Sequence, residues 1–177
     1  IVCYASVAQP DAMTGHIKTL ADVWRDTRTL DDAALAQQIR GDRIDILVDL
    51  TMHMAGGRRL LFARRPAVQV AWLAYPGTTG SAAMDYRLTD PWLNPLDEPR
   101  RDAFYSERSL RLPDTFWCYD AQVAGLEVGA LPAAGGAPIT FGFLNNPAKI
   151  GDHALHLWSG VLATVPHARL LLLAPPG

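Results

Sequence analysis

The chain has 177 residues, of which 49% are hydrophobic and 19% are charged, and its formal net charge at pH 7 is −2. This composition is typical of a folded chain with a sizeable core and excludes a disordered or fibrous protein. There is no block of Lys and Arg and no run of about 18 apolar residues, so we expect neither a nucleic-acid nor a membrane partner. Cys3 and Cys118 are too few for a disulfide framework, which favours a cytoplasmic location.

The first part of the chain alternates between strand-like and helix-like segments. It begins without Met at an apolar strand, residues 1–4, which is unlike a signal peptide and predicts a fragment of a longer chain. Asp31 and Asp32 lie at the positive end of one predicted helix. Strand 44–50 is almost continuously apolar, which predicts cover on both faces. The predicted helices span residues 11–24, 33–39 and 58–65, and the further strands residues 44–50 and 68–73.

The second part contains a composition change that predicts a domain boundary. Residues 124–138 are rich in Ala, Gly and Pro and are interpreted as a linker. Residues 1–123 and 139–177 are accordingly expected to belong to two different lobes. The predicted strands of this part span residues 86–88, 110–112, 139–144 and 169–173, and a helix spans residues 153–165.

Alternation of buried strands with helices predicts an α/β fold with parallel, doubly wound sheets. Ligands of such folds bind outside the carboxyl ends of the strands. The loops after Leu50, Leu73 and Leu144 are therefore the candidate binding loops.

The loop after Leu73 combines glycines with hydroxyl side chains. Exposed backbone N–H groups and small donors suit a phosphate or a sugar hydroxyl. The alternative is a tight Pro-Gly turn capped by a hydroxyl residue. The candidate binding residues are Tyr75, Pro76, Gly77, Thr78, Thr79 and Gly80.

The other two loops each carry one cationic or titratable candidate. His53 follows a strand end, where it could bind a ligand or act as a base, or could be a surface histidine beside the Gly56-Gly57 turn. Lys149 follows strand 139–144, where an ammonium neutralises a phosphate, and the alternative is a solvated lysine. Asp152 is predicted to cap the helix that follows. The histidines are dispersed without zinc-ligand spacing, so no metal site is predicted.

An ordered series of segments, taken together, closely resembles the catalytic region of the O-linked N-acetylglucosamine transferases, glycosyltransferase family 41. Its most specific part runs from Arg64 to Asp90, and the tail Phe141 to Lys149 resembles the start of that family's second catalytic lobe. The matching segments are residues 44–50, 56–58, 62–67, 68–73, 75–80, 84–86, 89–90 and 141–149.

The resemblance implies a GT-B fold of two Rossmann-like lobes. It implies inverting transfer of N-acetylglucosamine from a UDP-GlcNAc donor to Ser or Thr hydroxyls of a protein or peptide acceptor, with no metal and no cofactor. The family's phosphate-contacting lysine falls on Lys149, and a polar binding residue falls on Asn146. The 75–80 loop is then expected near the sugar or the acceptor.

Several family features are expected outside this sequence. They are a histidine-containing loop before Ile1, a diphosphate-binding loop after Gly177, and TPR repeats elsewhere in the parent chain. Ala148 replaces an aromatic residue of the animal enzyme, and residues 124–138 replace a long insertion, which suggests a bacterial-type homologue. The fragment alone is not expected to catalyse transfer. The alternatives are a GT-B transferase with another nucleotide sugar or a small-molecule acceptor, or a non-catalytic GT-B-like binding module.

Overall fold

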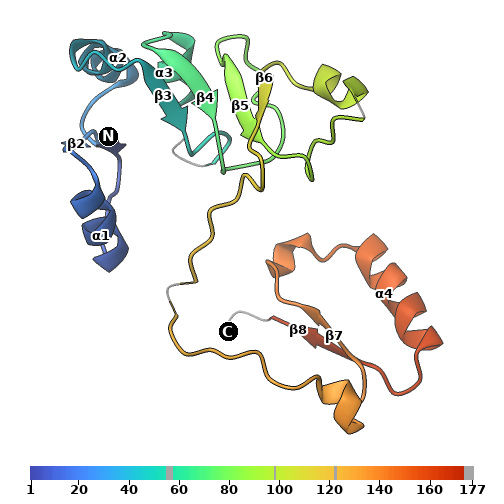
Figure 1. The fold of residues 1–177 in the computed structure, drawn as a ribbon. Helices are drawn as coiled ribbons and strands as arrows, with labels where there is room; N and C mark the ends of the chain where they lie inside the picture. The colour runs from blue at the N-terminus through green and yellow to red at the C-terminus, as the bar shows by residue number, and fades with distance from the viewer. Residues whose placement is uncertain (55–57, 98, 122, 174–177) are drawn as a thin grey trace. The chain divides into compact units, whose positions relative to one another are not determined.

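Parallel strands alternate with helices along the chain in the computed structural model (Figure 1). The structure describes residues 1–54, 58–97, 99–121 and 123–173. The chain divides into two units, residues 1–120 and 121–177. No helix within these described ranges is both long enough and apolar enough to cross a membrane.

The first unit begins with a parallel pair of short strands, β1 (Val2–Ala5) and β2 (Val23–Asp26), joined by helix α1 (Ala12–Leu20). The Asp11 side chain caps α1 by accepting a hydrogen bond from the Thr14 backbone N–H at 2.8 Å. The prediction of a helix through residue 24 is wrong. The helix ends four residues earlier because Val23 and Trp24 pair with β1, and this pairing outweighs the local helical spacing.

Helix α2 (Asp32–Gly41) follows β2 and supplies the centre of the core. Asp31 caps it, accepting from the Ala34 backbone N–H at 2.7 Å, so the predicted acidic start of this helix is confirmed. Its buried side chains are Leu35, Ala36 and Ile39. They belong to the core cluster that also includes Leu47, Met52, Leu61, Phe62, Ala71 and Met84.

A four-stranded sheet with the order β3-β4-β5-β6 forms the rest of the first unit. All its pairs are parallel, which confirms the predicted parallel α/β arrangement. The strands are β3 (Ile46–Asp49), β4 (Val68–Ala71), β5 (Tyr86–Thr89) and β6 (Arg108–Arg111), with helix α3 (Arg59–Ala63) before β4 and the 3-10 helix η1 (Pro99–Phe104) before β6.

Strand β3 is covered on one face only, so the prediction of cover on both faces is wrong. Leu47 and Asp49 are buried, whereas Ile46 is 61% and Val48 is 42% exposed. An apolar run indicates a buried strand only where other elements pack against both faces, and the described residues leave the Ile46 and Val48 face open.

One set of polar contacts joins the first strand pair to α2. Tyr4 donates from its hydroxyl to Asp42 at 2.8 Å, and Arg25 donates to the same carboxylate at 2.8 Å. Burial of the hydroxyl and the neighbouring Asp42 raise the pKa of Tyr4 well above its ordinary value. Asp42 therefore connects β1 and β2 to the carboxyl end of α2.

The second unit contains one parallel pair, β7 (Thr140–Phe143) and β8 (Arg169–Leu172), connected through helix α4 (Asp152–Thr164). The strand, helix and strand predicted here are confirmed. Asp152 does not cap α4, however; Gly151 is the N-cap and Asp152 is the first helical residue. Residues 124–138, expected as a linker, lie in this unit and contain the 3-10 helix η2 (Pro132–Gly135).

Candidate functional site

An aspartate at the end of β3 shapes the first candidate loop. Asp49 is 5% exposed, and its carboxylate accepts hydrogen bonds from the Thr51 N–H at 2.9 Å, the Thr51 hydroxyl at 2.8 Å and the Met52 N–H at 3.1 Å. The turn puts Met52 at a φ of 45°, a left-handed conformation that costs energy for this side chain. These hydrogen bonds fix the turn that precedes His53. Gly56 and Gly57, which the sequence predicted to form a turn beside it, lie outside the described residues.

His53 meets the second candidate loop. Its Nε2 lies 3.1 Å from the backbone carbonyl oxygen of Thr78, and its ring centroid is 6.5 Å from that of Tyr75. A carbonyl oxygen can only accept, so Nε2 carries the hydrogen of this bond. Two of the three predicted binding loops therefore come together in the first unit.

The two glycines of the second loop meet different structural requirements, a backbone conformation at Gly80 and space for a side chain at Gly77. Gly80 has a φ of +69°, a conformation that favours glycine, and a Cβ there would meet open space. A Cβ at Gly77 would lie 2.5 Å from Cε1 and 2.9 Å from Cδ1 of Tyr75. Gly77 therefore makes room for the Tyr75 ring, which is 62% exposed beside the exposed Pro76.

A buried acid that is not among the predicted site residues, Glu107, binds this loop through hydrogen bonds. It is 5% exposed and lies just before β6, and its carboxylate accepts from the Thr79 N–H at 2.7 Å, the Thr79 hydroxyl, and the Thr78 hydroxyl at 2.9 Å. Burial acts to raise the pKa of Glu107, but the hydrogen bonds from Thr79 and Thr78 outweigh it and hold the pKa below the ordinary 4.5. No local pattern could have found this acid, because its partners lie far away in the sequence.

A stacked pair supports the same region. The guanidinium of Arg87, on β5, lies 3.3 Å from the ring centroid of Tyr105, and the Tyr105 hydroxyl is 3.4 Å from the carbonyl oxygen of Pro76. Burial lowers the pKa of Arg87, although nearby acids including Asp102 and Glu107 oppose that shift. The segment before β6 therefore contacts the 75–80 loop at both of its ends.

A pocket of about 400 Å³ opens beside these loops. Its volume lies within the range of small-ligand sites, roughly 300–1,000 Å³. It is lined by Asp49, Met52, His53, Phe62, Thr79, Gly80, Ser81, Ala82 and Met84. Of the candidate residues, His53, Thr79 and Gly80 line the pocket directly.

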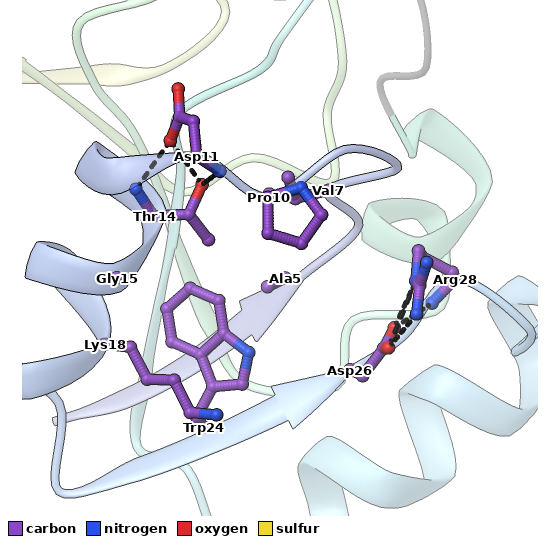
Figure 2. Close-up of a pocket in the computed structure, with 10 residues that line it drawn as sticks. All are labelled: Ala5, Val7, Pro10, Asp11, Thr14, Gly15, Lys18, Trp24, Asp26 and Arg28. Atoms are coloured by element: carbon purple, nitrogen blue, oxygen red, sulfur yellow. Dashed lines mark hydrogen bonds and ion pairs between the residues drawn. The ribbon is translucent and has the colours of Figure 1, made fainter.

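A second hollow in this unit contains none of the predicted site residues. Figure 2 shows its walls, which include the Trp24 indole, the capped start of α1 at Asp11 and Thr14, and the Asp26–Arg28 ion pair. Its volume is about 190 Å³, half that of the pocket beside His53. We therefore take the pocket beside His53 as the candidate ligand site of the first unit.

In the second unit, Lys149 and Asn146 lie in the loop after β7. Asn146 caps the 3-10 helix η3 (Pro147–Lys149), its side-chain oxygen accepting from the Ala148 N–H at 2.9 Å. The Lys149 backbone N–H donates to the Asn146 carbonyl at 3.0 Å, and its side chain is exposed. Lys149 therefore lies in the loop that follows the carboxyl end of β7. The Asn146 amide nitrogen is the part of that side chain able to donate to a ligand.

A resident metal centre is not apparent in the described ranges. Within them, no group of three or more His, Cys, Asp or Glu side chains is arranged to hold a metal ion.

Comparisons with known proteins agree with one another. The profile of glycosyl transferase family 41 matches residues 1–125. A probable UDP-N-acetylglucosamine–peptide N-acetylglucosaminyltransferase SPINDLY of Petunia hybrida is 38% identical over 181 residues, covering 99% of this chain and 19% of the relative. A probable transferase of the same description, SEC of Arabidopsis thaliana, is 30% identical over 186 residues, again covering 99% of this chain and 19% of the relative.

A solved structure is also similar. An O-GlcNAc transferase of Thermobaculum terrenum, in a mutant with lysine replaced by methionine, superposes with a TM-score of 0.83 and 40% identity, covering 97% of this chain and 32% of that one. The chain thus spans about a fifth of the length of the curated relatives. The parallel α/β units and these matches place the fold in the GT-B class. The chain belongs to glycosyl transferase family 41.

Proposed function

We propose that the protein containing this chain is an inverting transferase that moves N-acetylglucosamine from UDP-GlcNAc to Ser or Thr hydroxyls of a protein or peptide acceptor. Membership of family 41 and the names of the relatives support glycosyl transfer to peptides. The observation that supports the proposal for this chain is that Lys149 is exposed in the loop that follows the carboxyl end of β7. Such strand ends are where α/β folds bind their ligands.

The proposed role of Lys149 follows from the charge that develops during transfer. When the bond to the sugar breaks, UDP leaves with additional negative charge on its β-phosphate. A preorganised ammonium stabilises that charge more in the transition state than in the ground state, and this difference is what accelerates the reaction. We propose that transfer needs neither a metal nor a cofactor, with Lys149 supplying the positive charge at the diphosphate.

The first unit is proposed to bind the sugar or the acceptor. His53, Thr79 and Gly80 line a pocket of about 400 Å³, a volume that suits a small ligand such as a sugar. Asn146, three residues before Lys149, is proposed to donate from its amide nitrogen to the UDP-sugar. TPR repeats elsewhere in the protein and a cytoplasmic location remain part of the proposal.

The test is Lys149→Ala in the whole protein, assayed with UDP-GlcNAc and a peptide library. We expect a loss of about 10²–10³ in kcat, as for other electrostatic donors. The melting temperature should hardly change, because Lys149 is exposed and forms no ion pair with any residue that the structure describes. Lys18, the chain's other lysine, provides the matched control, and Lys18→Ala should leave turnover at the wild-type level.

The outcomes separate the proposal from its alternatives. Unchanged turnover in Lys149→Ala would remove the catalytic role of this residue. A wild-type protein that ignores UDP-GlcNAc but uses another sugar nucleotide from a donor panel would support the alternative donor. Binding of UDP without any transfer would support a non-catalytic module.

A further inference from the structure

We propose that Glu107 is a positioning residue for the transfer reaction and that it fixes the imidazole of His53 through Thr78. The inference rests on the proposed function, because it takes His53 to face the substrates. Glu107 is almost completely buried and lies just before β6, far from both candidate loops in the sequence. Nevertheless, its carboxylate is bound to the 75–80 loop.

Both carboxylate oxygens of Glu107 are engaged by two consecutive threonines. Oε1 accepts from the Thr79 backbone N–H at 2.7 Å and from the Thr79 hydroxyl. Oε2 accepts from the Thr78 hydroxyl at 2.9 Å. A buried carboxylate is costly unless such hydrogen bonds compensate it, so the loop and the acid hold each other in place.

The Thr78 hydroxyl transmits this constraint to its own backbone. It has a single hydrogen, which goes to Glu107 because a carboxylate can only accept. Its oxygen therefore accepts from the Gly80 N–H at 3.0 Å and from the Ser106 N–H at 3.2 Å. Thr78 is thus hydrogen-bonded to Gly80 of its own loop and to Ser106 in the segment before β6.

The backbone carbonyl of Thr78 is the last link. It accepts from Nε2 of His53 at 3.1 Å, so Nε2 is the ring nitrogen that carries the hydrogen of this bond. The imidazole is consequently held from two sides: Asp49 fixes its own loop, and Glu107 fixes the carbonyl that it donates to. Orientation and tautomer are the properties that a base or a hydrogen-bonding group needs for transfer.

The charge and hydrogen bonds of Glu107 indicate a role in positioning the loop and not only in packing the core. It forms no ion pair with any residue described in the structure, so direct hydrogen bonds from the loop hold its charge, with longer-range support from Arg87. An apolar side chain could occupy the same volume without the burial cost of a charge. What it could not supply is an acceptor for three donors of one loop.

The test is a double-mutant cycle in the whole protein with Glu107→Ala and His53→Ala. We expect Glu107→Ala to lower kcat about 10- to 100-fold with a smaller change in KM, because a shift of about 1 Å in a reacting group has effects of this size. The double variant should lose about as much as the larger single variant, because the two residues act in series. Losses that multiply would overturn the inference, as would a His53→Ala variant with wild-type turnover.

Conservative and control variants separate positioning from folding. Glu107→Gln should recover part of kcat, since its side-chain oxygen can still accept from the Thr79 N–H, whereas its amide nitrogen cannot accept from the Thr78 hydroxyl. Asp102→Asn alters an acid of the same segment that binds Ser109 and Arg111 instead of the loop. It should lower the melting temperature without coupling to His53.

Two further results keep the inference falsifiable. If Glu107→Ala does not fold, Thr78→Val removes the transmitting hydroxyl and should show the same coupling to His53. An inactive Lys149→Ala combined with independent, multiplying effects of Glu107 and His53 would overturn the inference and leave the proposed function standing. Binding of UDP without any transfer by the wild-type protein would overturn both.

Discussion

Exchanging the two glycines of the 75–80 loop for alanine should separate backbone strain from side-chain crowding. At Gly80 the φ of +69° would place alanine in the left-handed region, which costs about 1–2 kcal/mol, and the lower entropy of the unfolded chain returns about 0.4–1 kcal/mol. Gly80→Ala should therefore destabilise the protein by about 1 kcal/mol. No neighbouring atom opposes the new methyl group there.

Gly77→Ala, in contrast, should keep the stability of the protein but reduce transfer. Its methyl group would lie 2.5 Å from Cε1 of Tyr75, so the ring must move, and it can do so because the side chain is largely exposed. The entropy gain of about 0.4–1 kcal/mol then offsets the lost contacts, and the melting temperature should stay within about 2 °C of wild type. The displaced ring lies next to His53, so transfer should fall about tenfold even though stability is kept.

Thermal unfolding and steady-state transfer kinetics of both variants, measured in the whole protein, provide the assay. A Gly77→Ala variant that is less stable than Gly80→Ala would show that the Tyr75 ring cannot yield, and it would refute this reasoning. Gly77→Ala with wild-type transfer would show that the Tyr75 ring contributes nothing to the site.

Two predictions concern the acids that organise the loops. The pKa of Glu107 is lowered in the folded state, so its carboxylate stabilises the folded protein above its ordinary pKa of 4.5, and this contribution is lost as pH falls through the folded-state pKa. Hydrogen-exchange protection of the Thr79 amide should fall in that pH range. Glu107→Gln should remove this pH dependence. Asp90→Ala should destabilise the protein by about 3 kcal/mol, because it leaves the buried Phe116 N–H without its acceptor; urea unfolding measures the loss, and a change below about 1 kcal/mol would contradict it.

The sequence predicted much of the local structure because local chemistry decides it. Apolar runs rich in β-branched residues predicted the parallel strands β3 and β4, and the alternation with helices predicted loops at their carboxyl ends. Aspartate before α2 predicted its start, since the capping hydrogen bond spans only three residues. The ordered segments around residues 64–90 predicted the family, which the comparisons confirm.

The helix spacing around Trp24 was misleading, and the reason is tertiary. A strand as short as β2 owes its conformation to pairing with β1, some 21 residues earlier, and nothing within its own sequence specifies that partner. The open face of β3 has a similar cause, because cover is a property of what packs against a strand and not of the strand itself.

For the candidate site, too, sequence predicted the positions along the chain, and the tertiary structure determined the contacts. Sequence alone placed His53, Lys149 and the 75–80 loop at strand ends, because strand ends follow from hydrophobic patterning. Only the tertiary structure brought the His53 ring to the Thr78 carbonyl and set the Glu107 carboxylate beneath Thr79. Those hydrogen bonds join residues more than twenty positions apart, and their formation depends on how two crossover segments pack, which no local pattern encodes.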